Sequence, residues 1–451
     1  MPTWTTQQVE ALAPDASSAK AGKGLASPSK WKTLGCTEQA AWGECQGSGK
    51  DPYQTQVELS EPAFRCSCPS RKFPCKHGLG LMLVYAAQPG VFKDSTLPEW
   101  VSGWLAERAK RAEQKTEKDA QKAERAAQPV DPAAQAKRAA QRVAKVTAGL
   151  DYVETWLGDL IRSGLTGVPG QPYGFWETPA ARMVDAQAPG LARMIREMSG
   201  IAGTGEGWQE RLLERLGRLH LLIEGFRRLD TLPEPTQADI RSQIGWTVSQ
   251  DELFASVPAN ASVRDHWLVM GQRVEDEERL RVQRTWLRGQ ETGRDALLLH
   301  FAAFNQQLDR TFAPGSSFKG ELVYFPSGYP LRALVRSRQE GESQDLARGG
   351  YPSIGEATAA YANAVSAQPW LEEFPVGLQG LVPVRTGEGW LVRDPAGSAW
   401  PVAPTFARGW HLLAVSGGHP VTLAGEWNGQ HFLPLSCWTS DGFYPLLSSS
   451  P

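Results

Sequence analysis

The chain has 451 residues, of which 41% are hydrophobic and 21% charged, and its 47 Lys and Arg against 49 Asp and Glu give a net charge of −2. This length predicts several domains with cores of their own, and the composition excludes wholesale disorder, collagen-like sequence and coiled-coil rods. The chain has no apolar run of about 18 residues and does not start with a secretory signal pattern. We therefore expect a cytoplasmic protein with no role at a membrane.

The charge is unevenly distributed along the chain. Residues 1–145 contain 21 basic and 15 acidic side chains, whereas residues 146–451 contain 26 and 34. The front of the chain thus carries +6 and the remainder −8. Lysine is divided even more sharply, because Lys319 is the only lysine beyond Lys145. Such a break in composition predicts two differently built regions.

The first 100 residues are predicted to contain a small domain behind a short lead. We assign residues 1–27 to an N-terminal helix and a flexible lead, and residues 28–100 to the domain itself. Tyr53, Thr55, Val57 and Leu59 alternate with polar residues, which is typical of a strand. This strand leads toward a group of closely spaced cysteines.

Three cysteines and one histidine follow in the spacing CxC, six residues, CxH. They are Cys66, Cys68, Cys75 and His77. Three thiolates and one imidazole are a donor set that satisfies tetrahedral zinc. Disulfide pairing is a poor alternative, because a CxC pair is strained and the compartment is expected to be reducing. Inert buried cysteines are the other alternative, but three within ten residues beside a histidine disfavour it.

Local sequence predicts how these ligands meet. Cys66 and Cys68 project to the same side of an extended chain. Pro69 favours a turn, and Pro74 suits the start of a helix whose first turn would hold Cys75 and His77. The prediction is a ββα unit that holds one structural Zn²⁺, because four protein ligands leave no open position for water. Three further cysteines, Cys36, Cys45 and Cys437, are expected to lie outside this site.

The pattern resembles the SWIM zinc finger, in which a β-hairpin precedes the CxC–x6–CxH ligands and an apolar helix follows them. The match rests on Cys66, Cys68, Cys75 and His77, and the flanking stretch from Trp42 to Gly49 is similar to that of bacterial SWIM-containing proteins. SWIM domains occur beside chromatin ATPases, transposases and ubiquitin ligases. The resemblance therefore implies DNA or protein binding, and it implies no reaction.

Basic and aromatic residues surround the predicted ligands and form a candidate nucleic-acid surface. They are Arg65, Arg71, Lys72, Phe73 and Lys76, and residues 62–93 contain no acidic side chain. A basic surface held rigid by zinc could neutralise several phosphates of DNA or RNA. The alternative is that these cations only solvate the finger and balance its thiolates, since three thiolates on Zn²⁺ leave about −1.

Residues 101–145 are predicted to be a basic linker, partly helical and partly disordered. Residues 104–127 are rich in Ala, Lys, Arg, Glu and Gln, which are strong helix formers, but they have no apolar stripe. The prolines from Pro129 to Pro132 would break the helix. A basic arm that contacts nucleic acid is the alternative to a solvated tether.

Two further regions are predicted to follow, and the whole chain is expected to be an α+β multidomain protein. Residues 146–245 show apolar residues at helical spacing and predict a helical bundle. Residues 246–451 predict a Trp-rich, β-dominated domain with helices near 297–308 and 354–366. Eight of the seventeen tryptophans fall between Trp267 and Trp438, and we expect them in the core rather than on a base-stacking platform. The strands of this β-dominated domain are expected at Leu322–Phe325, Leu331–Val335, Leu381–Val384, Trp390–Val392, Trp410–Val415 and Phe432–Trp438.

Motifs for catalysis are weak, so we expect no enzyme. The stretch from Gly47 to Lys50 lacks the first glycine and the final Ser or Thr of a phosphate loop, and no small-molecule substrate is evident. The sequence thus favours a non-catalytic accessory factor that binds nucleic acid, most simply DNA, through the finger and linker. The alternative is an adaptor whose finger docks a protein partner.

Overall fold

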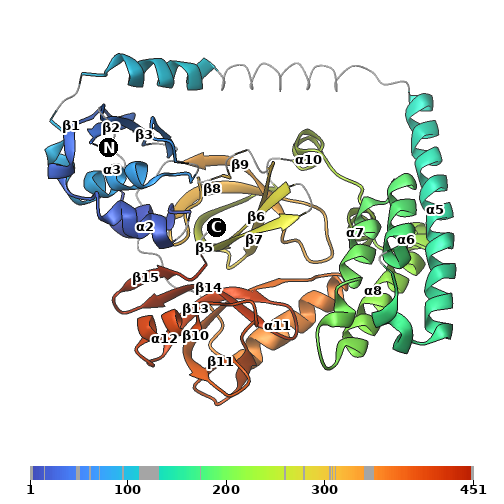
Figure 1. Ribbon diagram of the computed structural model, residues 1–451. Helices are drawn as coiled ribbons and strands as arrows, with labels where there is room; N and C mark the ends of the chain where they lie inside the picture. Colours follow the sequence, from blue (N-terminus) through green and yellow to red (C-terminus); the bar gives the residue numbers. More distant parts are fainter. Residues whose placement is uncertain are drawn as a thin grey trace.

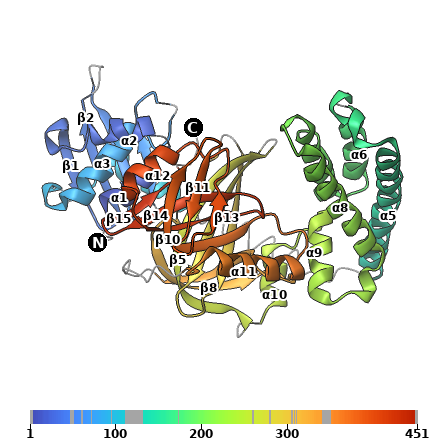
Figure 2. The same ribbon diagram turned by 90° about the horizontal axis from the view of Figure 1, so that it is seen from below.

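The protein is described by a computed structural model in which two β-sheets lie between an N-terminal region and a helical bundle (Figures 1 and 2). The predicted α+β multidomain class is confirmed. In the described part of the chain, no helix has the length and hydropathy that crossing a bilayer requires. The described residues are 4–14, 16–46, 51–59, 62–70, 72–93, 96–110, 132–172, 174–258, 261–277, 280–303, 306, 308–309, 311–339 and 350–447.

The N-terminal region is a four-stranded antiparallel sheet with three helices. The strands are ordered β1-β2-β3-β4, so each pairs with its neighbour in sequence. The elements are α1 (Thr6–Ala11), α2 (Ala16–Lys23), the 3-10 turn η1 (Pro28–Lys30), β1 (Trp31–Cys36), β2 (Ala40–Cys45), β3 (Tyr53–Glu58), β4 (Ala63–Cys66), α3 (Lys76–Ala87) and η2 (Pro89–Val91).

Helix α3 is the centre of this region's core. Every residue from His77 to Tyr85 is buried, because the sheet and the two preceding helices both contact α3. Val9 of α1 is fully buried in the same core. At Gly22 of α2, an added Cβ would lie 2.8 Å from the Cβ of Leu79, which shows how closely the two helices approach. The sequence predicts an N-terminal helix and a flexible lead over residues 1–27. The described part of this stretch contains two packed helices, because its few apolar side chains cover α3.

The predicted linker is only partly described. Residues 99–110 are helical, whereas residues 111–131, which include most of the predicted 104–127 helix and its proline break, lie outside the described residues. The next helix, α5, begins at Pro132, well before the predicted start of the bundle at Val146. The physical reason is that the Ala-rich stretch after Pro132 is made of strong helix formers and extends the helix.

The helical bundle is built around a core of aliphatic and aromatic side chains from all its helices. Val146, Leu150 and Val153 of α5 are buried, and they pack in one cluster with Leu219 and Ile223 of α8. Its elements are α5 (Pro132–Ser163), η3 (Leu165–Gly170), α6 (Gly174–Asp185), α7 (Pro189–Met198), η4 (Ile201–Gly203), α8 (Trp208–Arg227), η5 (Leu229–Thr231) and α9 (Glu234–Ile244).

A short helix, α10 (Gln250–Ser256), leads into a five-stranded antiparallel sheet of order β7-β6-β5-β8-β9. Along β5, Trp267 and Val269 pack on one face and Leu268 and Met270 on the other. The strands are β5 (Val263–Glu277), β6 (Leu280–Gly289), β7 (Asp295–Ala303), β8 (Ser317–Tyr324) and β9 (Ala333–Gln339). The helix predicted near 297–308 is wrong. Its first part is β7, which pairs with β6, because a short apolar run does not distinguish a strand from a buried helix.

A second sheet, of order β12-β11-β10-β13-β14-β15, completes the chain. Helix α11 packs on β10, and α12 packs near β10 and β14. The strand predicted at Trp410–Val415 is wrong, because these residues form α12, which ends at the left-handed Gly417. The elements are α11 (Ile354–Ala367), β10 (Phe374–Arg385), β11 (Trp390–Arg393), β12 (Ala399–Pro401), α12 (Gly409–Ser416), β13 (Val421–Trp427), β14 (Phe432–Thr439) and β15 (Gly442–Pro445).

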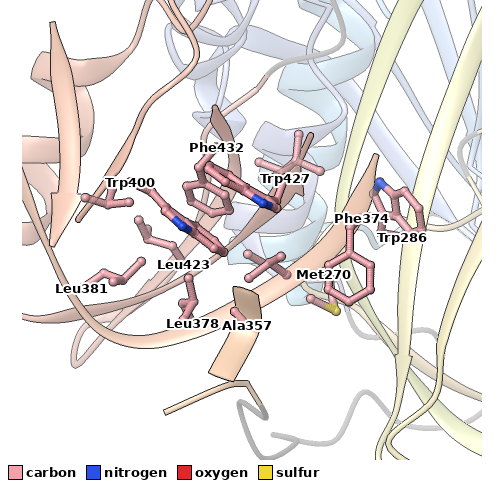
Figure 3. Close-up of a cluster of buried hydrophobic side chains, with 14 of the residues drawn as sticks. Met270, Trp286, Ala357, Phe374, Leu378, Leu381, Trp400, Leu423, Trp427 and Phe432 are labelled. Atoms are coloured by element: carbon pink, nitrogen blue, oxygen red, sulfur yellow. The ribbon is translucent and has the colours of Figure 1, made fainter. Parts of the chain in front are cut away.

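The two sheets share one core, in which tryptophans are prominent (Figure 3). Trp400 and Trp427 stack with ring centroids 4.0 Å apart and an interplanar angle of 8°. Trp286 of the five-stranded sheet enters the same cluster. Most of the eight tryptophans from Trp267 onward are buried, as expected, but Trp410 is 67% exposed.

The core also contains a network of buried charges. The guanidinium Nε of Arg273 lies 2.8 Å from Glu426, and Nη1 of Arg284 lies 2.8 Å from Glu373. The indole N–H of Trp286 donates to Glu426 over 2.6 Å. Burial and the neighbouring Glu373 carboxylate raise the pKa of Glu426 to about 7, although Arg273 opposes this shift. The β-rich region therefore neutralises its buried charges with its own side chains.

Candidate metal centre

Four potential ligands meet at one edge of the N-terminal sheet. Cys66 is the last residue of the edge strand β4, and Cys68 lies two residues beyond it. Cys75 is the residue that precedes the first turn of α3, and His77 lies within that turn. Because α3 packs against β3 and β4, the turn between strand and helix brings all four together.

The separations among the ligand atoms suit a single ion. One ligand atom from each residue can be chosen so that all four lie within 4.8 Å of one another. The Nδ1 atom of His77 lies 3.7 Å from Sγ of Cys66 and 4.0 Å from Sγ of Cys75. Ligand atoms around a tetrahedral zinc ion are separated by about 3.5–3.8 Å. The structure thus brings together the four side chains that the sequence indicated.

The electrostatics of the cluster also favour a cation. Hydrogen bonding from Cys66, supported by His77 and the Gly78 N–H, lowers the pKa of the Cys75 thiol to about 4 although burial opposes it. Pairing with Cys75, together with burial, raises the pKa of Cys66, and burial raises that of Cys68. The cluster therefore holds one thiolate readily and resists further ones. A divalent metal ion supplies the positive charge that lets all three thiols ionise.

Side chains behind the ligands orient them. The Thr55 hydroxyl lies 3.2 Å from Sγ of Cys66, which is its register partner in the β3–β4 pair. The Tyr53 ring lies 4.9 Å from the His77 ring, and His77 is only 4% exposed. Such supporting groups hold ligands in place in metal sites. Alternation along the strand places Thr55 and Tyr53 on one face, but no sequence pattern indicates that they support the ligands.

Aromatic packing fixes β4 against α3. The rings of Phe64 and Phe73 meet edge to face with centroids 6.2 Å apart. A Cβ added to Gly78 would lie 2.8 Å from the Phe64 ring, so α3 approaches β4 closely only because residue 78 is a glycine. These contacts set the distance between the strand ligands and the helix ligands.

The predicted nucleic-acid residues have different positions. Arg65, Lys72 and Lys76 are exposed around the metal cluster, although Arg65 also faces Glu107 at 3.8 Å and Lys72 donates to Ser17. Phe73 is half-buried against Phe64, so its ring serves packing first. Arg71 lies outside the described residues.

The other cysteines do not join the cluster, as expected from their spacing. Cys45 is buried and Cys36 half-buried, and burial raises the pKa of both thiols. Cys437 lies in the β-rich core, where burial raises its pKa to about 12. The glycine-rich stretch at residues 47–50 lies outside the described residues.

Two family models match the chain. The SWIM zinc finger model matches residues 53–86, which include all four ligands, and the model of the SWIM-associated four-helix bundle domain matches residues 141–244. The chain is therefore a SWIM domain-containing protein that combines a metal-binding finger with its associated bundle. Neither match extends into residues 246–451. No curated protein and no solved structure matches the chain.

Proposed function

We propose that Cys66, Cys68, Cys75 and His77 hold one structural Zn²⁺ and that the finger binds nucleic acid, most simply DNA, in a non-catalytic role. When bound, the ion supplies a rigid link between β4 and α3. Four protein ligands fill a tetrahedral coordination sphere, so no position is left for a reacting water. Cysteine ligands of this kind are kept reduced in a reducing compartment, which supports a cytoplasmic location.

The observation that carries the nucleic-acid proposal is the charge of the surface around the ligands. Arg65, Lys72 and Lys76 are exposed beside the cluster, and no acidic residue occurs in the sequence from residue 62 to residue 93. Phosphate contacts from such cations provide most of the sequence-independent affinity for DNA or RNA. The acidic remainder of the chain would repel the nucleic acid and leave the finger as the favoured face.

Apolar docking of a protein is less favoured by the same surface. The apolar side chains of α3 are covered by the sheet and by α1 and α2. Among the described residues up to 110, Leu97 is the only large hydrophobic side chain that counts as exposed, at 37%. Protein interfaces usually bury aromatic or aliphatic anchors, and the described finger surface offers few.

A salt series tests the proposal. Fluorescence anisotropy of labelled duplex DNA, single-stranded DNA and RNA would be measured with the full chain from about 50 to 200 mM salt, where phosphate-dependent affinity falls steeply. Lys76→Gln is expected to weaken binding to all sequences alike and to reduce the salt slope by about 1. Lys32→Gln is the matched control, because Lys32 is exposed on β1 at the opposite edge of the sheet from β4.

Two results would contradict nucleic-acid binding by the finger. One is an affinity that does not change with salt, and the other is an equal effect of Lys76→Gln and Lys32→Gln. Salt-independent capture of a protein by the finger would instead support the adaptor function.

A further inference from the structure

A cavity of about 480 Å³ lies where the helical bundle meets the β-rich region. One side is formed by α9 and the residues that follow it, including Arg241 and Trp246. The other side is formed by Trp286 of β6 and by the segment between β8 and β9, including Phe325 and Arg332. Ligand sites in proteins are commonly preformed clefts of this size at the junction of two domains.

The walls of the cavity are held together by two contacts across the junction. Trp370, from the segment between α11 and β10, is buried in the core of the bundle and donates its indole N–H to the Arg218 carbonyl over 3.1 Å. Asp239 of α9 accepts a hydrogen bond from the Gly328 N–H at 2.8 Å. Trp370 and Asp239 both line the cavity, so these two contacts set its shape before any ligand binds.

The acidic side chains that line the cavity are all engaged. Asp239 accepts the Gly328 hydrogen bond just described. Glu372 pairs with Arg215 at 3.0 Å, and Glu373 pairs with Arg284 at 2.8 Å. The charges of Glu372 and Glu373 are therefore balanced by arginines, whereas Asp239 accepts hydrogen bonds and burial raises its pKa, which favours the neutral form.

Two arginines in the cavity lining have no acidic partner among the described residues. Both Arg241 and Arg332 are exposed to solvent, and within the part of the chain that the structure describes neither guanidinium forms an ion pair or a hydrogen bond with the protein. Arg332 lies over the Phe325 ring at 4.3 Å, and the surrounding walls lower its pKa, as expected for a cation without a counter-charge. A guanidinium stacked in this way is preorganised for a planar anionic group.

We propose that this cavity binds a small organic anion that carries a flat ring. The two unpaired arginines would hold a phosphate or carboxylate, and the aromatic lining, which includes Tyr329 and Trp246, would contact the ring. Nucleotides and aromatic carboxylates share this chemistry. The site is separate from the finger and does not depend on the function proposed for it.

Isothermal titration calorimetry with the full chain tests the site. The probes are adenosine monophosphate and indole-3-acetate, with adenosine, indole and inorganic phosphate as partial ligands. At least one ring-bearing anion is expected to bind at least tenfold more tightly than its neutral counterpart and than phosphate. The better of the two identifies the source of the anion.

Variants locate the binding. Arg332→Gln and Arg241→Gln are each expected to weaken it tenfold or more, and Arg332→Lys is expected to weaken it despite keeping the charge, because lysine lacks the planar donor pair. Arg228→Gln is the matched control, since Arg228 directly follows α8, lies outside the cavity lining and has 66% of its side chain exposed. Lys76→Gln should bind as the wild type does, which separates this cavity from the finger. The proposal would be overturned if neither anion binds at millimolar concentration. It would also be overturned if Arg332→Gln and Arg241→Gln each bind the anion as tightly as the wild type does.

Discussion

The finger and the β-rich region both bury polar groups, but they stabilise them in different ways. The finger gathers three thiols and an imidazole within 4.8 Å, and their charge is balanced only when a cation binds. The β-rich region buries Arg273, Arg284 and Glu426 and pairs them with one another and with Glu373. The finger should therefore depend on metal, and the β-rich region on its internal ion pairs and on pH.

Loss of the metal should have the largest effect, and it should be confined to the finger. Structural zinc contributes about 10–16 kcal/mol in zinc-finger peptides, so Cys75→Ser or chelation should unfold the ligand turn and α3. Hydrogen exchange followed by mass spectrometry should show lost protection in α3 and unchanged protection in β10. His77→Cys keeps four ligands and should retain the metal, whereas equal loss of protection in both regions would contradict the comparison.

Breaking the buried network should have the next largest effect, and it should fall on the other region. Removing one partner of a buried ion pair costs about 3–5 kcal/mol, so Arg273→Ala should lower the free energy of unfolding by that amount. Urea denaturation measured by tryptophan fluorescence would report it. Arg264→Ala is the control, because 80% of the Arg264 side chain is exposed beside Glu321 and such pairs contribute about 0–1 kcal/mol. A similar cost for both variants would argue against a special role for the network.

The two regions should respond to pH with opposite signs. Burial raises the pKa of Glu426 to about 7, above its unfolded value, so its contribution to stability is fully present at low pH and is lost as pH rises to about 7. The stability of Glu426→Gln relative to wild type should therefore rise from about pH 4 to pH 7, by on the order of 3 kcal/mol, and then level off. Metal binding needs deprotonated thiols, so the finger should instead weaken as pH falls. Unfolding curves at several pH values would check both the Glu426 effect and the weakening of the finger at low pH. A difference between Glu426→Gln and wild type that does not change with pH would refute the Glu426 effect.

The smallest effect on stability should come from Arg65. Its guanidinium lies 3.8 Å from Glu107 and both side chains are more than half exposed, so Arg65→Gln should change the free energy of unfolding by less than about 1 kcal/mol. The same variant should reduce the salt slope of nucleic-acid binding. A large loss of stability without a change in binding would show that Arg65 has a structural role instead.

The metal cluster could be predicted from sequence because its ligands are close in the chain. Cys66 and Cys68 flank one residue, and Cys75 and His77 flank another, so local turn and helix signals were enough to place them together. The packing of α1 on α3 could not be predicted, because Val9 and Met82 join one core only through the tertiary fold.

The junction cavity could not be predicted from sequence either, because its residues meet only in the folded chain. Arg241 and Arg332 are far apart in sequence, and neither stands in a recognisable motif. The segment predicted as a helix near 297–308 and the strand predicted at 410–415 failed for a related reason. Both are short apolar runs, and only their neighbours in space decide between strand and helix.

We propose that one zinc ion occupies the cluster of Cys66, Cys68, Cys75 and His77. Native mass spectrometry of the full chain tests it most directly, because the mass reports the metal and its stoichiometry together. We predict one zinc ion per chain in the wild type and none in the Cys66→Ser, Cys75→Ser double variant. A wild-type chain that is metal-free, or a double variant that keeps its zinc, would contradict the assignment.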